Sequence, residues 1–247
     1  MPVITLTTEW RASDYYIGAM KGALLSKCPE AQIIDLAHEI QTYNVIQTAF
    51  ILKNNFYLYP PETIHIVCVD TEEYEEKRHV VMKFREHFFI GTDNGIFSLI
   101  SEDQPYEAVE INPSSKNELS TFPELNVFTR AAQTLYKNKN IDSLGGTGYE
   151  LSKQTLFLPV IDDNMLNGNV VYIDSYKNAV TNIHHDLFRQ IGKNRKFDIY
   201  VQSYHHKYKT SRINLKYGET EPGELLAIFN SLGFLEIAIN KGPASEL

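Results

Sequence analysis

The chain has 247 residues, which is enough for one large domain or two smaller ones with separate hydrophobic cores. Hydrophobic residues make up 43% and charged residues 22%, as in ordinary globular proteins. The formal net charge of −8 argues against nucleic acid or an anionic membrane surface as the main partner, and it leaves a cationic ligand possible.

Cys28 and Cys68 lie within apolar stretches and have no partner ligands at zinc spacing, which indicates two buried thiols in a reducing compartment. The first residues lack the basic start and apolar core of a signal peptide, and no apolar run reaches the ~18 residues of a membrane span. HExxH, GxSxG and CxxC motifs are also missing. We therefore expect a cytoplasmic protein without a bound metal.

The first half of the chain alternates predicted strands with predicted helices. Ser13 and Asp14 can cap a helix in which Ile17, Met20 and Leu24 recur at helical spacing. The predicted strands are 3–8, 32–37, 64–69, 79–84 and 87–91, and the predicted helices are 14–27, 44–57 and 126–137. This order predicts an α/β domain with a mainly parallel central sheet over residues 1–150.

The pattern changes after residues 138–154, which are polar and aperiodic and are expected to form a linker. Short strand-like segments separated by Gly, Asn and Pro then predict a smaller β-barrel or sandwich domain over residues 151–247. The segment 224–232 is expected to form a short helix before the last strand. The adjacent histidines at 184–185 and 205–206 are expected to lie in solvated loops.

Polar residues follow four strands of the first domain, where open α/β sheets bind their ligands. They are Glu9, Asp35 with His38 and Glu39, Asp70, and Asp93 with Asn94. Any one of these carboxylates could instead cap the next helix or close a turn, but together they favour a cleft rich in carboxylates. A second polar cluster, residues 174–178 with Thr181 and Asn182, fits either a hairpin loop or a ligand contact.

Seven segments resemble, in order, those of the S-adenosylmethionine hydroxide adenosyltransferase family, whose relatives include the fluorinase and the chlorinase. They are ITLTTEWRASDYYIGAMKG (4–22), IDLAHEI (34–40), IHIVCVD (64–70), FIGTDNGIF (89–97), TFPELNVFTRAA (121–132), YIDSYKNAVTNI (172–183) and NSLGFLEIAIN (230–240). The resemblance spans nearly the whole chain. It implies an N-terminal α/β domain followed by a C-terminal β-barrel.

The resemblance also implies an assembly and a reaction. Such proteins are typically homotrimers that bind S-adenosylmethionine between the N-terminal domain of one subunit and the C-terminal domain of its neighbour. Water attacks the ribose C5′ atom, methionine leaves and adenosine forms. S-adenosylmethionine is then the substrate or ligand, and no cofactor is implied.

Individual positions match substrate-binding positions of the family. Glu9 stands where a carboxylate grips the ribose hydroxyls, and Asp174 where one holds the methionine ammonium group. The other matching positions are Thr121 and Phe122 in the nucleoside pocket, Tyr176 and Asn178 against adenosine, and Ser231 near the methionine carboxylate.

The sequence departs from the family at the reactive positions. The family positions water with an Asp–Arg–His set, of which Asp70 matches the Asp. Lys77, followed by Arg78, stands in place of the Arg, and Pro123 in place of the His. Lysine does not reproduce the planar guanidinium, and proline has no side chain that can move a proton. The glycine-rich turn after the Asp has become a bulky acidic loop, 71–76.

Three functions remain open from the sequence. The protein hydrolyses S-adenosylmethionine with Asp70 and Lys77 as a rearranged acid–base pair, or it binds this molecule or a related nucleoside without turnover, or it is a trimeric scaffold with an empty site. The acidic loop argues against a halide nucleophile, because it would repel an anion.

Overall fold

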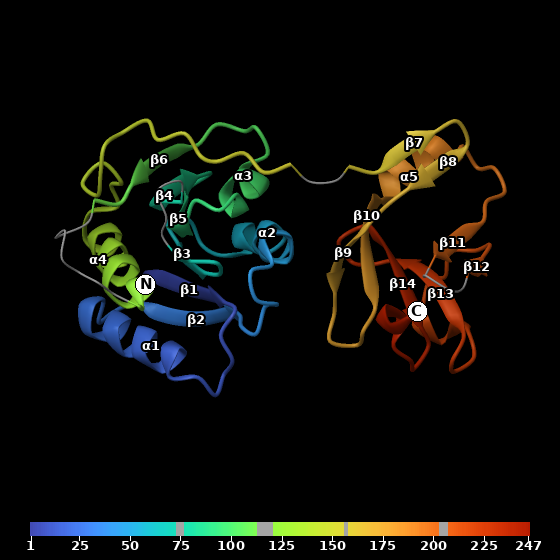
Figure 1. Ribbon diagram of the computed structural model, residues 1–247, viewed down its shortest axis with the longest axis horizontal. Helices are drawn as coiled ribbons and strands as arrows, with labels where there is room; N and C mark the ends of the chain where they lie inside the picture. The colour runs from blue at the N-terminus through green and yellow to red at the C-terminus, as the bar shows by residue number, and fades with distance from the viewer. Residues whose placement is uncertain (73–76, 113–120, 156–157, 203–206) are drawn as a thin grey trace. The chain divides into compact units, whose positions relative to one another are not determined.

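The computed structural model describes residues 1–72, 77–112, 121–155, 158–202 and 207–247. The chain divides into two compact units, Met1–Thr155 and Leu156–Leu247, which we call the N-terminal and C-terminal domains. Figure 1 labels their helices and strands.

The N-terminal domain is built on a six-stranded sheet with the order β2-β1-β3-β5-β4-β6. Its strands are β1 (Val3–Thr8), β2 (Gln32–Ala37), β3 (Ile64–Cys68), β4 (His79–Phe84), β5 (His87–Thr92) and β6 (Glu107–Glu110). Neighbouring strands from β2 to β5 pair in parallel, and β4 pairs antiparallel with β5 and β6. The predicted α/β domain with a mainly parallel sheet is therefore confirmed.

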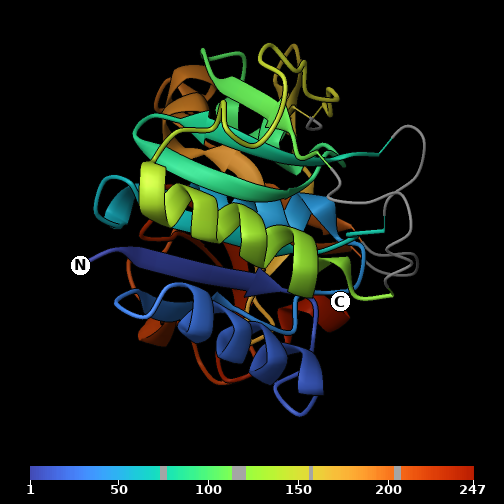
Figure 2. The ribbon, with the colours of Figure 1, turned by 90° about the vertical axis from the view of Figure 1, so that its left-hand side faces the viewer.

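Helices cover both faces of this sheet. α1 (Tyr15–Lys27) and α4 (Thr129–Asn138) lie on one face, and α2 (Val45–Lys53) and α3 (Ile96–Ser101) on the other (Figure 1). In Figure 2, α1 and α4 lie side by side in front of the sheet, and β1 is seen behind the gap between them. The predicted apolar stripe of α1 is confirmed, since Ile17, Met20 and Leu24 are its buried residues.

Two helix predictions differ from the structure in extent. α2 ends at Lys53, where Asn54 follows, and a separate 3₁₀ turn at Phe56–Leu58 completes the segment. α4 is preceded by a π-helical turn at Glu124–Phe128, so helical structure begins directly after Pro123. Pro123 suits this place because its fixed φ of −62° is already helical and its missing N–H would have no helical partner.

The order of the strands creates a switch point between β1 and β3. The chain leaves β1 through α1 to reach β2 on one side, and returns through α2 to β3 on the other side. The two connections therefore diverge where β1 and β3 end, at Thr8 and Cys68. A crevice at such a point is where open α/β sheets place their ligands.

The expected linker at 138–154 is instead packed on the N-terminal domain. The backbone N–H of Tyr149 donates to the carbonyl of Ala108 in β6, and the Tyr149 hydroxyl donates to the Asp93 carboxylate. Gly145 lies so close to the Glu110 carbonyl that a Cβ atom would sit 1.7 Å from its oxygen. The lack of periodicity did not predict this packing, because hydrogen bonds rather than apolar contacts hold the segment on the domain.

The C-terminal domain consists mainly of antiparallel sheets, as the sequence predicted. Four strands pair in the order β13-β14-β10-β9, and two hairpins pair β7 with β8 and β11 with β12. The strands are β7 (Val160–Asp162), β8 (Met165–Asn167), β9 (Val170–Ile173), β10 (Ala179–His184), β11 (Ile199–Gln202), β12 (Lys207–Thr210), β13 (Leu225–Phe229) and β14 (Phe234–Ile239). A core that includes Ile183, Ala227, Leu235 and Ile237 lies within this domain.

Two expectations for this domain are wrong. The segment 224–232 holds strand β13 rather than a helix, and its residues pair antiparallel with β14 from Leu225↔Ile239 to Phe229↔Leu235. His184 ends β10, and His185 begins α5 (His185–Gly192), so these histidines do not lie in a loop. The second histidine pair, 205–206, lies outside the described residues.

Both cysteines are buried and free, as expected. Among the described residues, every helix is too short or too polar to cross a bilayer.

Candidate functional site

Glu9 connects three segments at the switch point. It follows β1, and its backbone N–H donates to the carbonyl of Cys68 at the end of β3, over 3.1 Å. Its carboxylate accepts from the backbone N–H of Asp70 at 3.1 Å through Oε1, and from that of Tyr43 at 2.6 Å through Oε2. Glu9 therefore brings together the ends of β1 and β3 and the loop that precedes α2.

Asp70 and Lys77 form an ion pair beside Glu9. Lys77 Nζ donates to Asp70 Oδ2 at 2.6 Å, and the Asp70 side chain is 18% exposed. Arg78 lies instead 3.8 Å from the Glu110 carboxylate, measured from Nε to Oε1. Neighbouring side chains on extended backbone point to opposite sides, so Lys77 rather than Arg78 is the cation next to Asp70.

The backbone at Asp70 adopts an unusual conformation. Its φ is +49°, in the left-handed region that disfavours residues with a Cβ atom. Asn94, which follows β5, holds this turn by donating from Nδ2 to the carbonyls of Val69 and Asp70, at 2.9 and 3.2 Å. Strained backbone that neighbouring groups hold in place often marks a functional site.

Glu124 is a buried carboxylate at this site that the sequence did not reveal. Its exposed fraction is 4%, and its Oε1 accepts a hydrogen bond from the hydroxyl of Thr71, the residue after Asp70. Burial raises the pKa of Glu124, and the hydrogen bond from Thr71 opposes this shift. A glutamate in a first helical turn is ordinarily a surface residue, so its position after Pro123 gave no signal of burial.

Four aromatic side chains form a cluster next to Glu9: Trp10, Tyr15, Tyr16 and Phe122. The Phe122 ring meets the other three edge-on at centroid distances of 5.0–6.2 Å. Phe122 is 9% exposed, whereas Tyr15 is largely exposed and Thr121 lies on the surface. The aromatic cluster thus presents ring surface that could contact the face of a base.

Two of the strand-end carboxylates have structural partners elsewhere. Asp35 pairs with Lys21 at 2.7 Å and with His38 at 3.0 Å. Asp93 is 3% exposed and accepts from the Tyr149 hydroxyl and from the N–H and hydroxyl of Ser152, at 2.9–3.0 Å. Glu9 and Asp70 are the predicted strand-end carboxylates that the structure places together, through the bond between Glu9 Oε1 and the Asp70 amide.

In the C-terminal domain, Asp174 closes the turn between β9 and β10. Its Oδ1 accepts from the backbone N–H of Tyr176 at 2.9 Å and of Asn178 at 2.8 Å, and its Oδ2 accepts from Asn178 Nδ2 at 3.1 Å. Asn178 is buried, while the Tyr176 side chain is 79% exposed. The structure therefore brings Asp174, Tyr176 and Asn178 together and leaves the Tyr176 ring accessible.

Ser231 lies exposed in the turn between β13 and β14. The neighbouring Asn230 shapes this turn, because its Oδ1 accepts from the backbone N–H groups of Leu232 and Phe234 at 3.0 and 3.1 Å.

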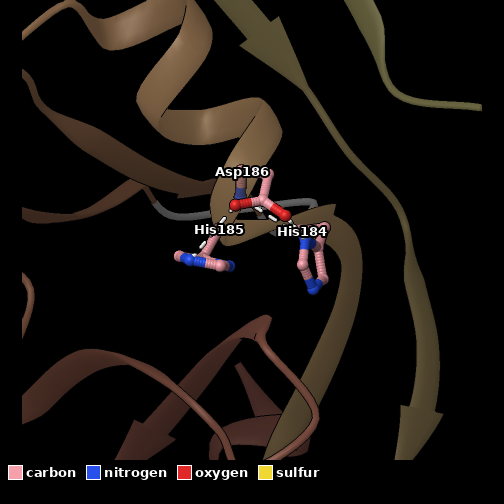
Figure 3. A group of neighbouring side chains, drawn as sticks. All are labelled: His184, His185 and Asp186. Atoms are coloured by element: carbon pink, nitrogen blue, oxygen red, sulfur yellow. Dashed lines mark hydrogen bonds and ion pairs between the residues drawn. The ribbon is translucent and has the colours of Figure 1, made fainter.

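His184, His185 and Asp186 form the group in the described residues whose atoms could converge on a metal ion (Figure 3). Both histidines already contact the Asp186 carboxylate, at 3.3 Å from His184 Nδ1 and 3.2 Å from His185 Nε2. His184 Nδ1 also accepts from the Asp186 backbone N–H at the start of α5. These contacts account for the grouping as a helix cap in which the Asp186 carboxylate lies beside both imidazole rings.

A hollow of about 280 Å³ lies at the other end of the strands, away from the switch point. Its lining includes Val3 and Ile64, which begin β1 and β3, together with prolines and the Glu62–Lys139 ion pair. Because it lies at the amino ends of the strands, we do not assign the ligand site to it.

The fold and the site define a class: a two-domain protein with acidic groups at the switch point of a mainly parallel sheet, followed by an antiparallel β domain. The sequence matches the SAM hydroxide adenosyltransferase N-terminal domain over residues 4–145 and the corresponding C-terminal domain over residues 168–247. The chain belongs to the SAM hydroxide adenosyltransferase family.

Relatives and solved structures match over the full length. The chain is 27% identical to a protein of Methanocaldococcus jannaschii and 26% identical to one of Thermus thermophilus, both named (R)-S-adenosyl-L-methionine hydrolase. All of this chain aligns with 92% of the first and 95% of the second. A conserved protein of Thermotoga maritima has a similar structure, with a TM-score of 0.86 and 28% identity over 99% of this chain and 94% of its own.

Proposed function

We propose that the protein hydrolyses S-adenosylmethionine to adenosine and methionine, with water attacking the ribose C5′ atom. The observation that carries this proposal is the Asp70–Lys77 pair beside Glu9 at the switch point of the sheet, in a chain that matches the family in both domains. The name of the full-length relatives, which specifies S-adenosyl-L-methionine hydrolysis, supports the same reaction.

The reaction asks the protein mainly to align water and to exclude bulk solvent. A sulfonium is already a good leaving group, whereas water is a poor nucleophile that gains from orientation and desolvation. Asp70 can accept a hydrogen bond from the attacking water through the oxygen that does not bind Lys77. Lys77 keeps this carboxylate oriented through a charge-assisted hydrogen bond of 2.6 Å.

Glu9 can hold the ribose without giving up its structural contacts. Each carboxylate oxygen has two acceptor sites, so both oxygens can accept from the ribose hydroxyls while retaining the N–H groups of Asp70 and Tyr43. Thr121 and Phe122 complete the nucleoside side of this proposed site, with Phe122 as part of the aromatic cluster.

We also propose that the active protein is a homotrimer, in which Asp174, Tyr176, Asn178 and Ser231 of one subunit bind the ligand that Glu9 of the neighbouring subunit holds. The family resemblance supports this assembly. Light scattering coupled to gel filtration should give three times the mass of the 28.3 kDa chain. The monomer mass at micromolar concentration would contradict the shared site.

The hydrolysis is tested by incubating the purified protein with each sulfonium epimer of S-adenosylmethionine and measuring adenosine and methionine by chromatography. Asp70→Asn should slow their release by about 10²-fold or more, because the uncharged amide cannot replace the carboxylate. Asp35→Asn is the matched control, since Asp35 also lies at a strand end but pairs with Lys21 and His38. Failure to form adenosine, or equal rates for wild type and Asp70→Asn, would refute the proposal.

A second candidate is binding without turnover, which the Lys77 and Pro123 replacements favour. In this case calorimetry would detect S-adenosylmethionine binding while chromatography found neither product. A cytoplasmic location and the exclusion of nucleic acid remain predictions from the sequence.

A further inference from the structure

We propose that Glu124 is the proton acceptor for the attacking water, a role that the sequence leaves vacant where Pro123 stands. The inference rests on the proposed hydrolysis and names the base of that site. It starts from the position of the carboxylate: Glu124 opens the π-helical turn before α4 and is hydrogen-bonded to Thr71, whose neighbour in the chain is Asp70.

The surroundings of Glu124 separate its carboxylate from bulk water. It is 4% exposed, and the π-helical turn that carries it contacts both α1 and α4. Thr71 is held in turn, because its carbonyl accepts from Thr92 Oγ1 at 3.2 Å and lies 3.0 Å from His79 Nε2. The hydrogen bond to Glu124 therefore comes from a residue that is itself held in place, and that residue directly follows Asp70 in the chain.

Four titratable groups interact with Glu124. The charges of Glu9 after β1 and His79 on β4 act on the pKa of Glu124. The Glu124 charge in turn adds to the raised pKa values of Tyr16 on α1 and Cys68 at the end of β3. Burial raises the pKa of Glu124, and the negative charge of Glu9 adds to this effect. The hydrogen bonds from Thr71 and the backbone, and the nearby His79, act in the opposite direction. A carboxylate with a raised pKa is a stronger base than an exposed one, as general base catalysis near neutral pH requires.

The chemical step balances with these groups. The water oxygen forms a bond to the ribose C5′ atom while the C5′–S bond breaks, and the bonding electron pair returns to sulfur. The positive sulfonium becomes the neutral thioether of methionine. The proton that water loses goes to the Glu124 carboxylate and is released to solvent after the products leave. Asp70 orients the same water and stays paired with Lys77.

The decisive variant is Glu124→Gln, which keeps the shape of the side chain and an oxygen that can accept from Thr71. The rate of adenosine release should fall by about 10²–10⁴-fold, as expected for loss of a general base. The wild-type rate should decline as the pH falls through the raised pKa of Glu124, and this acid limb should be missing in Glu124→Gln. Affinity for S-adenosylmethionine, measured by calorimetry, should change by less than about fivefold, or ~1 kcal/mol. The reason is that Glu124 acts on the attacking water and not on the ligand itself.

Thr71→Val provides a companion test of similar volume. It removes the hydrogen bond that lowers the pKa of Glu124, so the acid limb should move to higher pH in an otherwise active enzyme. A purely structural role of Glu124 would lower the rate at all pH values and would not shift this limb.

The outcomes separate this inference from the proposed function. If wild type releases adenosine and methionine but Glu124→Gln keeps both its rate and its acid limb, Glu124 is not the base and the hydrolysis stands. If wild type releases neither product at any pH, the proposed function fails and the role of Glu124 fails with it.

Discussion

His65 and His87 form a buried imidazole pair in the N-terminal domain. The Thr5 hydroxyl lies 2.8 Å from His65 Nδ1, and His65 Nε2 lies 3.3 Å from His87 Nδ1. Burial, and then the nearby His87, lower the pKa of His65 to about 3, and burial also lowers the pKa of His87. Both rings are therefore neutral in the folded protein at neutral pH.

This pair predicts a loss of stability in mild acid. The pKa of His65 is lower in the folded chain than the ~6.5 of an unfolded histidine, so the unfolded chain binds the proton first as the pH falls. The stabilisation is complete above pH ~6.5 and declines toward pH 3, by about 1.4 kcal/mol per pH unit. Urea unfolding at pH 7 and pH 5 should therefore differ by about 2 kcal/mol from His65 alone.

The control for this prediction is His65→Asn, which offers Thr5 a similar polar atom but does not titrate. Its stability should fall less between pH 7 and pH 5 than that of wild type. Equal losses in the two proteins would assign the acid sensitivity to other groups.

The turn between β13 and β14 needs a glycine at position 233, for its dihedral angle and for the space around it. Gly233 has a φ of +81°, and its N–H donates to the Asn230 carbonyl, while a Cβ atom there would lie 2.4 Å from His184 Nε2. Gly223 has a similar φ of +89°, but nothing lies within 4 Å of its added Cβ. The two glycines therefore separate the cost of the dihedral angle from the cost of the contact.

We expect Gly223→Ala to destabilise the protein by roughly 1–2 kcal/mol, because only the left-handed conformation is penalised. Gly233→Ala should cost more, since His184 must also move away from its place beside Asp186. Thermal unfolding of both variants against wild type measures the difference. A smaller effect at Gly233 than at Gly223 would contradict this reading of the turn.

The same turn shows what the sequence could predict and what it could not. The residues 224–232 include a short apolar run that is compatible with either a helix or a strand, and only its pairing with the distant β14 decides between them. α1 was predictable because its apolar stripe is a local feature, although the Asp14 side chain at its N-cap position makes no capping hydrogen bond. At the site, the positions of Glu9 and Asp70 at strand ends were predictable, whereas the burial of Glu124 depends on how its π-helical turn packs against α1 and α4.

The N-terminal domain extends to Thr155, beyond the last residue of its sheet. Asp93 is buried, and its donors are Tyr149 and Ser152, in the segment that the sequence indicated as a linker. Gln154 adds a backbone N–H that donates to Ser98 Oγ at 3.0 Å. The motifs that identify the family reach both domains, but none of them revealed these contacts.

A fragment of residues 1–155 should therefore be more stable than one of residues 1–145. The shorter fragment leaves the Asp93 carboxylate buried without Tyr149 and Ser152, which should cost about 2 kcal/mol or more. Urea unfolding of the two fragments gives the difference, and Ser152→Ala in the longer one should account for part of it. Equal midpoints would show that these hydrogen bonds do not stabilise the domain.

The position of the Asp93 contacts also indicates where foreign sequence can enter the chain. Ser152 and Gln154 fasten the segment to the sheet and α3 just before the first compact unit ends at Thr155. An epitope tag or a protease recognition sequence inserted directly after Thr155 would leave those bonds intact. Cleavage at such an insert would then release the first unit with the hydrogen bonds to Asp93 still in place.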